Sequence, residues 1–214
     1  MIGNSQDKKE IVKTIVAAAK PYHDKLVGRR FLYYFEGQHI EVEYQSKNFL
    51  HLTGVNTMLS ALSFYKKALG TSKTGAILTY KQIWFDKDHP YDLCLSKALH
   101  LDSLHLLSNS SLIILTDVHT DTADFDYALT NSDYSVCVGL DKNSANIYVP
   151  YSLRDEDCFS RSKNQFEVNY IFCNENNSSL YKKIMYQDGT VTLEDLPQDM
   201  IEKLSPELLG KPGN

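Results

Sequence analysis

The second half of the chain is built from short apolar segments separated by polar turns. From Ser111 onward, SLIILTDV, DFDYALTN, YSVCVGLD and ANIYVPYSL follow one another at short intervals, with Asn, Ser and Asp between them. QFEVNYIFCN alternates regularly, and LYKKIMYQDGTV is typical of a further strand. Connections this short cannot hold a crossover helix, so the pattern predicts an antiparallel sheet.

The first half of the chain predicts helices around one β-hairpin. Apolar residues at helical spacing behind the candidate caps Asn4 and Ser5 predict an N-terminal helix that ends, or gives way to a second helix, at Pro21. Alternation on both sides of the turn EGQ, residues 36–38, predicts a hairpin whose second strand has one solvated acidic face.

Two more helices are predicted between the hairpin and the sheet. The first covers residues 58–69, with Asn56 or Thr57 as its cap and Gly70 as its end. The second covers residues 90–107 and carries Lys97. The order of helix, hairpin, helices and antiparallel sheet indicates an α+β fold in one compact domain.

The composition restricts the partners and the environment of the chain. Its 214 residues have a formal net charge of −5, which argues against broad non-specific binding of polyanions but is compatible with a local basic pocket. No apolar run approaches the ~20 residues of a membrane span. The polar N-terminus is not expected to be a signal peptide, and the four cysteines form no C-x-x-C pair. We therefore expect a cytoplasmic protein with reduced thiols.

The common enzyme motifs are absent. The chain has no glycine-rich phosphate loop, no dinucleotide fingerprint, no H-E-x-x-H and no G-x-S-x-G. Residues 117–126 are rich in Asp, Thr and His but lack the spacing of a metal loop, so a solvated acidic loop is the expectation. We expect neither a metal nor a cofactor.

The stretch KNFLHLTGVN, residues 47–56, holds a histidine among apolar neighbours. Histidine exchanges protons near neutral pH, and Thr53 and Gly54 behind His51 suggest a turn at a strand-to-helix junction that faces a cleft. The alternative is a half-buried histidine bonded to a backbone carbonyl, and the pattern alone favours that alternative.

Two cationic residues are candidates for phosphate contacts. Arg154 follows a strand that runs through YVPYSL, and arginine suits bidentate phosphate contacts. Its alternative role is pairing with Asp155, Glu156 or Asp157 in a solvated loop. Lys97 lies in a leucine-rich helix, where the usual alternative is a side chain that extends to the solvent.

Four segments in a fixed order carry a family resemblance: FEGQHIEVEYQSKNFLHLTGV, FYKKAL, LCLSKALHLDSL and NIYVPYSLRDED. With them the chain resembles the phage-associated branch of the Barnase–EndoU–Colicin–RelE-like (BECR) nucleases, in its fourth phage subfamily. The resemblance covers residues 26–172. It implies N-terminal helices packed on a curved antiparallel sheet. We expect a nuclease domain in 26–175, preceded by an N-terminal helix in 1–25 and followed by a C-terminal strand and short helices in 176–214 that pack on the domain or trail it.

The resemblance also implies a metal-independent ribonuclease of phages or mobile elements. Such an enzyme needs a base for the ribose 2′-hydroxyl, an acid for the leaving 5′-oxygen, and cations or amides beside the phosphorane. RNA is then the substrate, and a neutralising protein is a possible partner. The resemblance assigns catalysis to His51, Thr53, Lys97 and Arg154, and substrate contacts to Gly54, Tyr65, Tyr151 and Ser152, with Tyr65 or Tyr151 stacking on a base.

Two other functions fit the sequence. The acidic composition, and the lack of a second histidine beside His51, are compatible with a catalytically inactive module that binds RNA, a nucleotide or a protein in phage–host conflict. An ADP-ribosyltransferase is less well supported, because no strand carries a glutamate of the expected kind.

Overall fold

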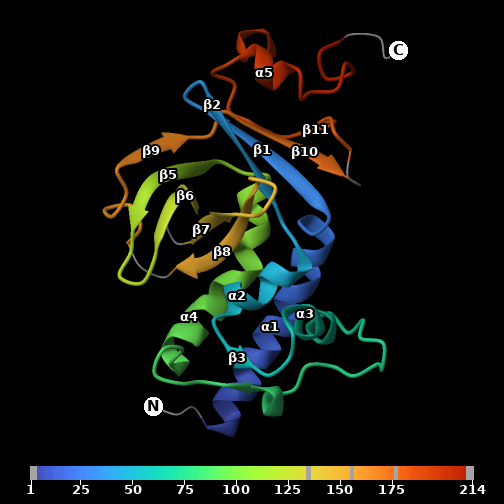
Figure 1. Ribbon diagram of the computed structural model, residues 1–214, viewed down its shortest axis with the longest axis vertical. Helices are drawn as coiled ribbons and strands as arrows, with labels where there is room; N and C mark the ends of the chain where they lie inside the picture. Colours follow the sequence, from blue (N-terminus) through green and yellow to red (C-terminus); the bar gives the residue numbers. More distant parts are fainter. Residues whose placement is uncertain (1–3, 134–135, 155–156, 176–177, 211–214) are drawn as a thin grey trace.

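A nine-stranded sheet curls over a group of helices in the computed structural model, which describes residues 4–133, 136–154, 157–175 and 178–210 (Figure 1). The strand order is β11-β10-β1-β2-β8-β7-β6-β5-β9. β2 pairs with β8 in parallel, and the other described pairings in this sheet are antiparallel, which confirms the predicted α+β fold. The strands are β1 (Arg29–Phe35), β2 (Gln38–Glu43), β5 (Leu112–His119), β6 (Asp124–Asn131), β7 (Cys137–Lys142), β8 (Tyr148–Arg154), β9 (Asn164–Glu167), β10 (Tyr170–Glu175) and β11 (Lys183–Gln187).

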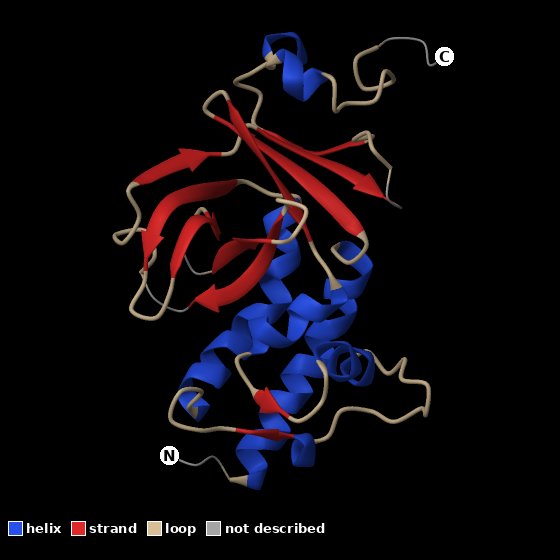
Figure 2. Cartoon of the chain, viewed as in Figure 1, coloured by secondary structure: helices blue, strands red, loops and turns tan. Residues whose placement is uncertain are grey.

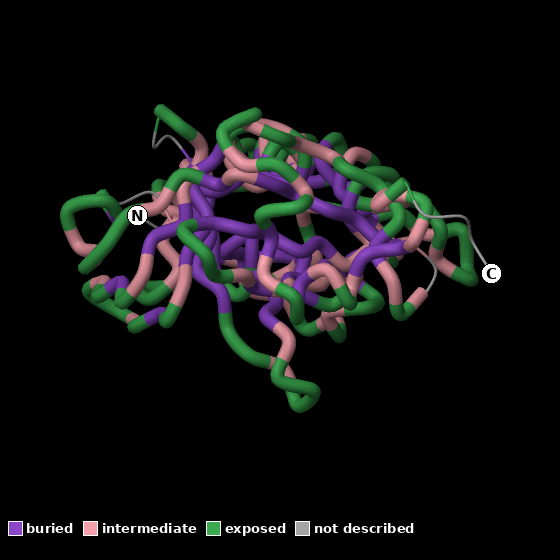
Figure 3. Tube along the Cα trace, turned by 90° about the horizontal axis from the view of Figure 1, so that it is seen from above, coloured by how far each residue is buried: buried purple, intermediate pink, exposed green. Residues whose placement is uncertain are grey.

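The helices lie mainly on one side of this sheet (Figure 2). Their apolar faces and the inner face of the sheet form the main core, which Figure 3 shows as buried segments in the interior of the molecule. A small two-stranded sheet joins β3 (Asn56–Thr57) to β4 (Ile83–Trp84). The α-helices are α1 (Ser5–Lys25), α2 (Phe49–Thr53), α3 (Ala61–Ala68), α4 (Tyr91–His100) and α5 (Gln198–Ile201), and the 3₁₀-helices are η1 (Ser46–Asn48), η2 (Tyr80–Gln82), η3 (Leu101–Ser108) and η4 (Leu193–Asp195).

Helix α1 begins as predicted but continues through Pro21. The Asn4 side chain accepts hydrogen bonds from the amides of Gln6 and Asp7, and the Asp7 carboxylate accepts one from the Asn4 amide at 2.8 Å. Proline removes the amide that would bond to the carbonyl of Ala17. Ala17 is exposed, so its carbonyl can bond to water, and the buried Tyr22 anchors the next turn in the core. The predicted end at Pro21 is therefore wrong.

The helix predicted over residues 58–69 is shorter than expected. Helix α3 begins at Ala61, and the Ser60 hydroxyl caps it by accepting a hydrogen bond from the Ser63 amide at 3.3 Å. Met58 precedes the helix and is 89% exposed, so it is not part of the predicted apolar stripe. The predicted end at Gly70 is confirmed by its φ of +75°, a left-handed conformation that suits a residue just after a helix.

The helix predicted over residues 90–107 is present as two pieces. Helix α4 is α-helical, and the chain then tightens into η3. Leu101, Leu104 and Leu107 are buried at steps of three residues, which matches the three residues per turn of a 3₁₀-helix. The leucine pattern thus places the buried face correctly although the type of helix changes.

The segment QFEVNYIFCN forms two strands where one was predicted. β9 pairs with β5, whereas β10 pairs with β1. At the break, the Val168 amide bonds to the carbonyl of Leu112 and the Asn169 amide to that of Tyr34. The chain thus passes from β9, at one end of the strand order, directly to β10, the second strand from the other end. The sheet curls between these two strands (Figure 1).

The acidic face of β2, predicted to be solvated, is covered by the C-terminal segment. Glu41 accepts hydrogen bonds from the Tyr181 hydroxyl at 2.8 Å and from the Lys203 ammonium, and Arg30 lies 3.5 Å away. A second apolar cluster on the same side of the sheet includes residues from β1, β10 and the tail: Leu32, Tyr34, Tyr170, Phe172, Tyr181, Leu196, Met200 and Leu204. The tail is thus packed on the sheet.

Glu41 is expected to make stability depend on pH. Burial raises the pKa of Glu41, but the hydrogen bonds from Lys203 and Tyr181 outweigh burial and hold it below its ordinary value. Because the folded-state pKa lies below the unfolded value of about 4.3, the stabilisation is present above that pH and is lost as the pH falls through the folded-state pKa. Chemical denaturation at a series of pH values should therefore show a smaller loss of unfolding free energy on acidification for Glu41→Gln than for the unmodified protein.

The matched control for Glu41→Gln is Glu43→Gln. Glu43 lies on the same strand but makes no ion pair with a described residue. Its variant is expected to keep the pH dependence of the unmodified protein. Equal pH dependence in both variants would contradict the role of Glu41.

Candidate active site

The segment NFLHLTG forms a short helix that ends in a tight turn, not the predicted strand-to-helix junction. Residues 49–53 form α2, and Gly54, with φ +72° in the left-handed region, reverses the chain toward β3. Phe49, Leu52 and Thr53 face the core, whereas His51 is exposed. His51 therefore points away from the core, whereas Gly54 at the end of the helix is buried.

Gly54 packs directly on Lys97 of α4. A Cβ atom on Gly54 would lie 2.8 Å from Lys97 Cδ, so only glycine fits without movement of the lysine. The Cys94 thiol donates a hydrogen bond to the Gly54 carbonyl at 3.1 Å. Burial raises the pKa of Cys94 to about 11, so Cys94 is a neutral donor that joins the two elements and not a nucleophile.

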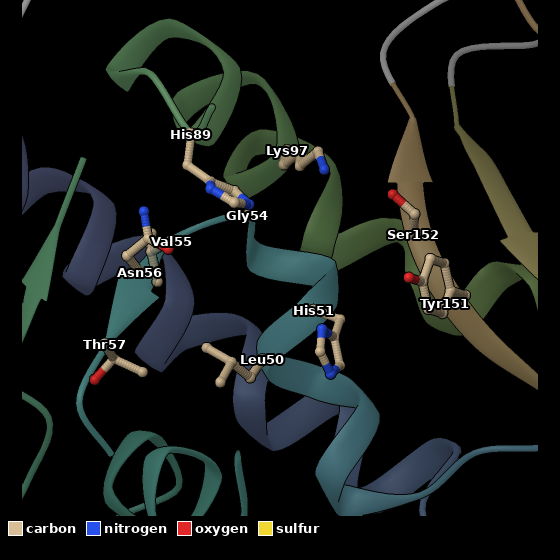
Figure 4. Close-up of a pocket in the computed structure, with 10 residues that line it drawn as sticks. All are labelled: Leu50, His51, Gly54, Val55, Asn56, Thr57, His89, Lys97, Tyr151 and Ser152. Carbon is tan, nitrogen blue, oxygen red and sulfur yellow. The ribbon is translucent and has the colours of Figure 1, made fainter. Parts of the chain in front are cut away.

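A central cleft lies between α2, the start of α4 and β8 (Figure 4). It consists of two adjoining hollows of about 370 and 560 Å³, which share His89, Lys97, Tyr151 and Ser152. The first is also lined by His51 and Gly54, and the second by Arg154. The central cleft therefore brings together six of the eight predicted site residues: His51, Gly54, Lys97, Tyr151, Ser152 and Arg154.

His51 faces Tyr151 across the cleft. Their ring planes are 12° apart and their centroids 6.2 Å apart, and Figure 4 shows the two rings on opposite walls. His51 makes no hydrogen bond with a described residue. The alternative of a half-buried histidine tied to a backbone carbonyl is therefore wrong, and the imidazole is open to a ligand.

Arg154 is held at the second hollow by β6 and the loop before it. Its guanidinium lies 5.1 Å from the centre of the Phe125 ring, and Nη1 donates to the Thr122 hydroxyl at 2.7 Å. Phe125 fits there because Gly139 has no side chain: a Cβ on Gly139 would lie 2.6 Å from the ring. Asp155 and Glu156, two of its alternative partners, lie outside the described residues.

Lys97 is part of the cleft wall and does not extend over the protein surface. It is only 8% exposed, and Figure 4 shows its ammonium directed toward Ser152 on β8. The Lys97 ammonium thus lies in the same hollow as His51, His89 and Tyr151.

The chain matches a known family model over most of its length. A family model described as phage-Barnase-EndoU-ColicinE5/D-RelE like nuclease4 matches residues 14–190. The chain belongs to this family. The resemblance seen in residues 26–172 is thereby confirmed, and the match extends on both sides of it. No curated protein and no solved structure matches the chain.

Two predicted site residues of this nuclease-family chain lie outside the cleft. Thr53 is buried, and its hydroxyl donates to the Leu50 carbonyl at 2.7 Å and accepts a bond from the Val55 amide, so it closes the turn after α2. Tyr65 is buried against Phe49, and burial raises its pKa strongly. Its hydroxyl meets His23 Nδ1 at 3.1 Å, so it cannot stack on a base in the cleft.

His89 is a second histidine of the cleft, and the sequence does not single it out. It lines both hollows, and Asp86 positions it by accepting hydrogen bonds from the amides of Asp88 and His89. Asp86 also accepts from the Asn56 side chain at 2.9 Å, which ties this loop to β3. His89 Nδ1 lies 3.5 Å from Asp86 and is shielded from solvent, so Nε2 is the nitrogen that can reach a ligand. The signal in the sequence that could have identified His89 is Asp86, an aspartate three residues before a histidine that precedes a helix.

The remaining predictions concern metals and membranes. Within the described residues, no three His, Cys, Asp or Glu side chains gather into a group that could hold a metal ion. In the same part of the chain, no helix combines the length and the apolar character that crossing a membrane requires.

Proposed function

We propose that the protein is a metal-independent endoribonuclease that cleaves RNA by attack of the ribose 2′-hydroxyl on the adjacent phosphate. The observation that carries the proposal is the meeting of two histidines and two cationic side chains in one cleft of a nuclease-family chain: His51, His89, Lys97 and Arg154. Divalent-ion sites are usually built from clustered carboxylates, whereas these groups serve acid–base chemistry and phosphate binding.

The two histidines supply the proton transfers. One imidazole removes the proton of the 2′-hydroxyl as O2′ bonds to phosphorus, and the other gives a proton to O5′ as the P–O5′ bond breaks. The products are a 2′,3′-cyclic phosphate and a 5′-hydroxyl. His51 on α2 and His89 before α4 line the same hollow, which suits residues that act on opposite sides of one phosphate.

The cations and the polar wall stabilise the phosphorane. Lys97 and Arg154 offset the negative charge that develops on the phosphoryl oxygens, and Gly54 permits close approach of the backbone. Ser152 adds a hydroxyl donor. Tyr151, which is 47% exposed, offers its ring to a base beside the scissile phosphate.

Cleavage of RNA in EDTA is the first test of the proposed function. The purified protein is incubated with a single-stranded RNA and with the same sequence made as DNA. We expect cleavage of the RNA to 2′,3′-cyclic phosphate ends and no cleavage of the DNA, because DNA lacks the attacking hydroxyl. The ends are identified with phosphatase, which does not act on a 2′,3′-cyclic phosphate but removes the terminal phosphate after acid has opened the ring.

The control is an RNA with a single 2′-deoxy nucleotide at the mapped cleavage site. Loss of cleavage at that site alone supports attack by the 2′-hydroxyl. Cleavage of the deoxy-substituted site, or cleavage that stops in EDTA, would contradict the mechanism. Binding of RNA without cleavage would support the alternative of an inactive binding module.

A further inference from the structure

A second hollow lies on α3 and on the loop after it. It has a volume of about 490 Å³, and its lining includes lysines 66, 67 and 73 and the hydroxyl residues Ser63, Ser72 and Thr74. It shares no residue with the central cleft. In Figure 1, α3 and this loop lie on one side of α1, and α4 and β8 lie on the other.

The charge of this hollow is unusual for an acidic chain. Its lining holds three lysines and no carboxylate. None of the three ammonium groups forms an ion pair with a described residue, whereas lysines such as Lys142 and Lys183 lie beside carboxylates. Three like charges that line one hollow without a carboxylate among them repel one another, so an anion that binds here relieves the repulsion.

The dipole of α3 accounts for only two of the three lysines. Lys66 and Lys67 lie in the last turn of the helix, where a cation is favoured for that reason alone. Lys73 comes from the loop, which is folded back by two backbone bonds: the Thr71 amide bonds to the Lys66 carbonyl, and the Leu78 amide to the Lys67 carbonyl. The fold of the loop thus brings the third lysine to the other two.

We infer that this hollow binds a phosphate of single-stranded nucleic acid, in a part of the substrate outside the central cleft. Lysine ammonium groups bind phosphate as point charges. The hydroxyls of Ser63 and Thr74 make no hydrogen bond with a described residue and are available as donors. Leu62, which is 46% exposed, gives an apolar surface for a ribose or base beside the phosphate. The inference rests on the proposed function, because the ligand is a segment of the proposed substrate.

The test is the salt dependence of binding to a fluorescent single-stranded DNA. DNA lacks the 2′-hydroxyl, so the titration measures binding whether or not the protein cleaves RNA. The variant is Lys66→Gln/Lys67→Gln/Lys73→Gln, and its matched control is Lys25→Gln/Lys163→Gln/Lys182→Gln, which removes three exposed lysines from other elements. Thermal unfolding of both variants checks that they fold.

We expect weaker binding by the first variant and a shallower salt dependence. Loss of the one bound phosphate reduces the slope of log K against log salt by about 0.7, the contribution of one phosphate contact on a single strand. The control is expected to keep the original slope. Equal slopes in both variants overturn the inference. The inference is also overturned if the first variant loses binding to an oligoglutamate peptide while its DNA slope is unchanged. That result assigns the hollow to an acidic protein. Absence of RNA cleavage is a separate result that contradicts only the proposed function.

Discussion

Replacing His51 or His89 with alanine is expected to reduce the rate of RNA cleavage by about 10²–10⁴ each, the usual contribution of a positioned acid or base. His51 is exposed and free of hydrogen bonds to described residues, and His89 is held by a loop that Asp86 organises through backbone amides. Neither alanine therefore removes a contact on which the core depends. The measurement is the single-turnover rate with an RNA of known cleavage site, together with the melting temperature of each variant.

Two further variants make this result specific. His105→Ala removes a histidine of η3 whose Nδ1 donates a hydrogen bond to the Asp102 carbonyl in the same turn. The cleavage rate of this variant is expected to match that of the unmodified protein. The double variant His51→Ala/His89→Ala is expected to be little slower than the slower single variant, because an acid and a base that act in one transition state are strongly non-additive. Unchanged cleavage in His89→Ala would remove His89 from the mechanism and leave His51 to be tested alone.

The sequence predicts those elements whose signals are local. The hairpin is one example: alternation and the turn predicted over residues 36–38 place both strands. Gln38 already belongs to β2, and positive φ at Glu36 and Gly37, +44° and +73°, is what the resulting two-residue turn requires. The packing of the C-terminal segment on β2 and the break between β9 and β10 depend on contacts with residues distant in the chain. Glu41 meets Lys203 only after the whole sheet has formed, so no local pattern contains that contact.

The candidate site also combines residues that local sequence signals identify with residues that only the fold brings together. The HLTG segment identifies His51 and Gly54, but a helix of five residues is too short for its periodicity to be recognised. Thr53 was therefore placed in the cleft although it follows His51 by two positions and faces the core. Tyr65 was assigned to stacking because an aromatic residue serves a core and a stacking surface equally well in sequence. His89 has no motif, and its place in the cleft follows only from the way the fold brings β3 and α4 together.

Gly54→Ala is expected to destabilise the protein through two separate effects. The left-handed backbone at φ +72° costs a non-glycine residue about 1–2 kcal/mol. The contact of the new Cβ with Lys97 Cδ adds about 1–3 kcal/mol of overpacking, unless the lysine moves. At about 2–4 °C per kcal/mol for a chain of this size, the melting temperature falls by several degrees.

Gly70→Ala is the matched control, because Gly70 also follows a helix at φ +75° and nothing lies within 4 Å of its added Cβ. It carries the backbone penalty without the contact, so its loss of unfolding free energy should be the smaller of the two. The Lys97→Ala background separates the effects further. Without the lysine side chain, Gly54→Ala should cost only as much as Gly70→Ala.

Cleavage activity gives an independent measurement of the same contact. If the alanine displaces Lys97, single-turnover cleavage falls in Gly54→Ala even at temperatures where the variant is fully folded, because the ammonium no longer meets the phosphate. Gly70→Ala does not move the lysine and is expected to cleave normally under those conditions. Equal losses of stability for Gly54→Ala with and without Lys97 would show that the two residues are not coupled. The close packing of α2 on α4 would then have no part in positioning the cation, and the role of Gly54 would reduce to its backbone conformation.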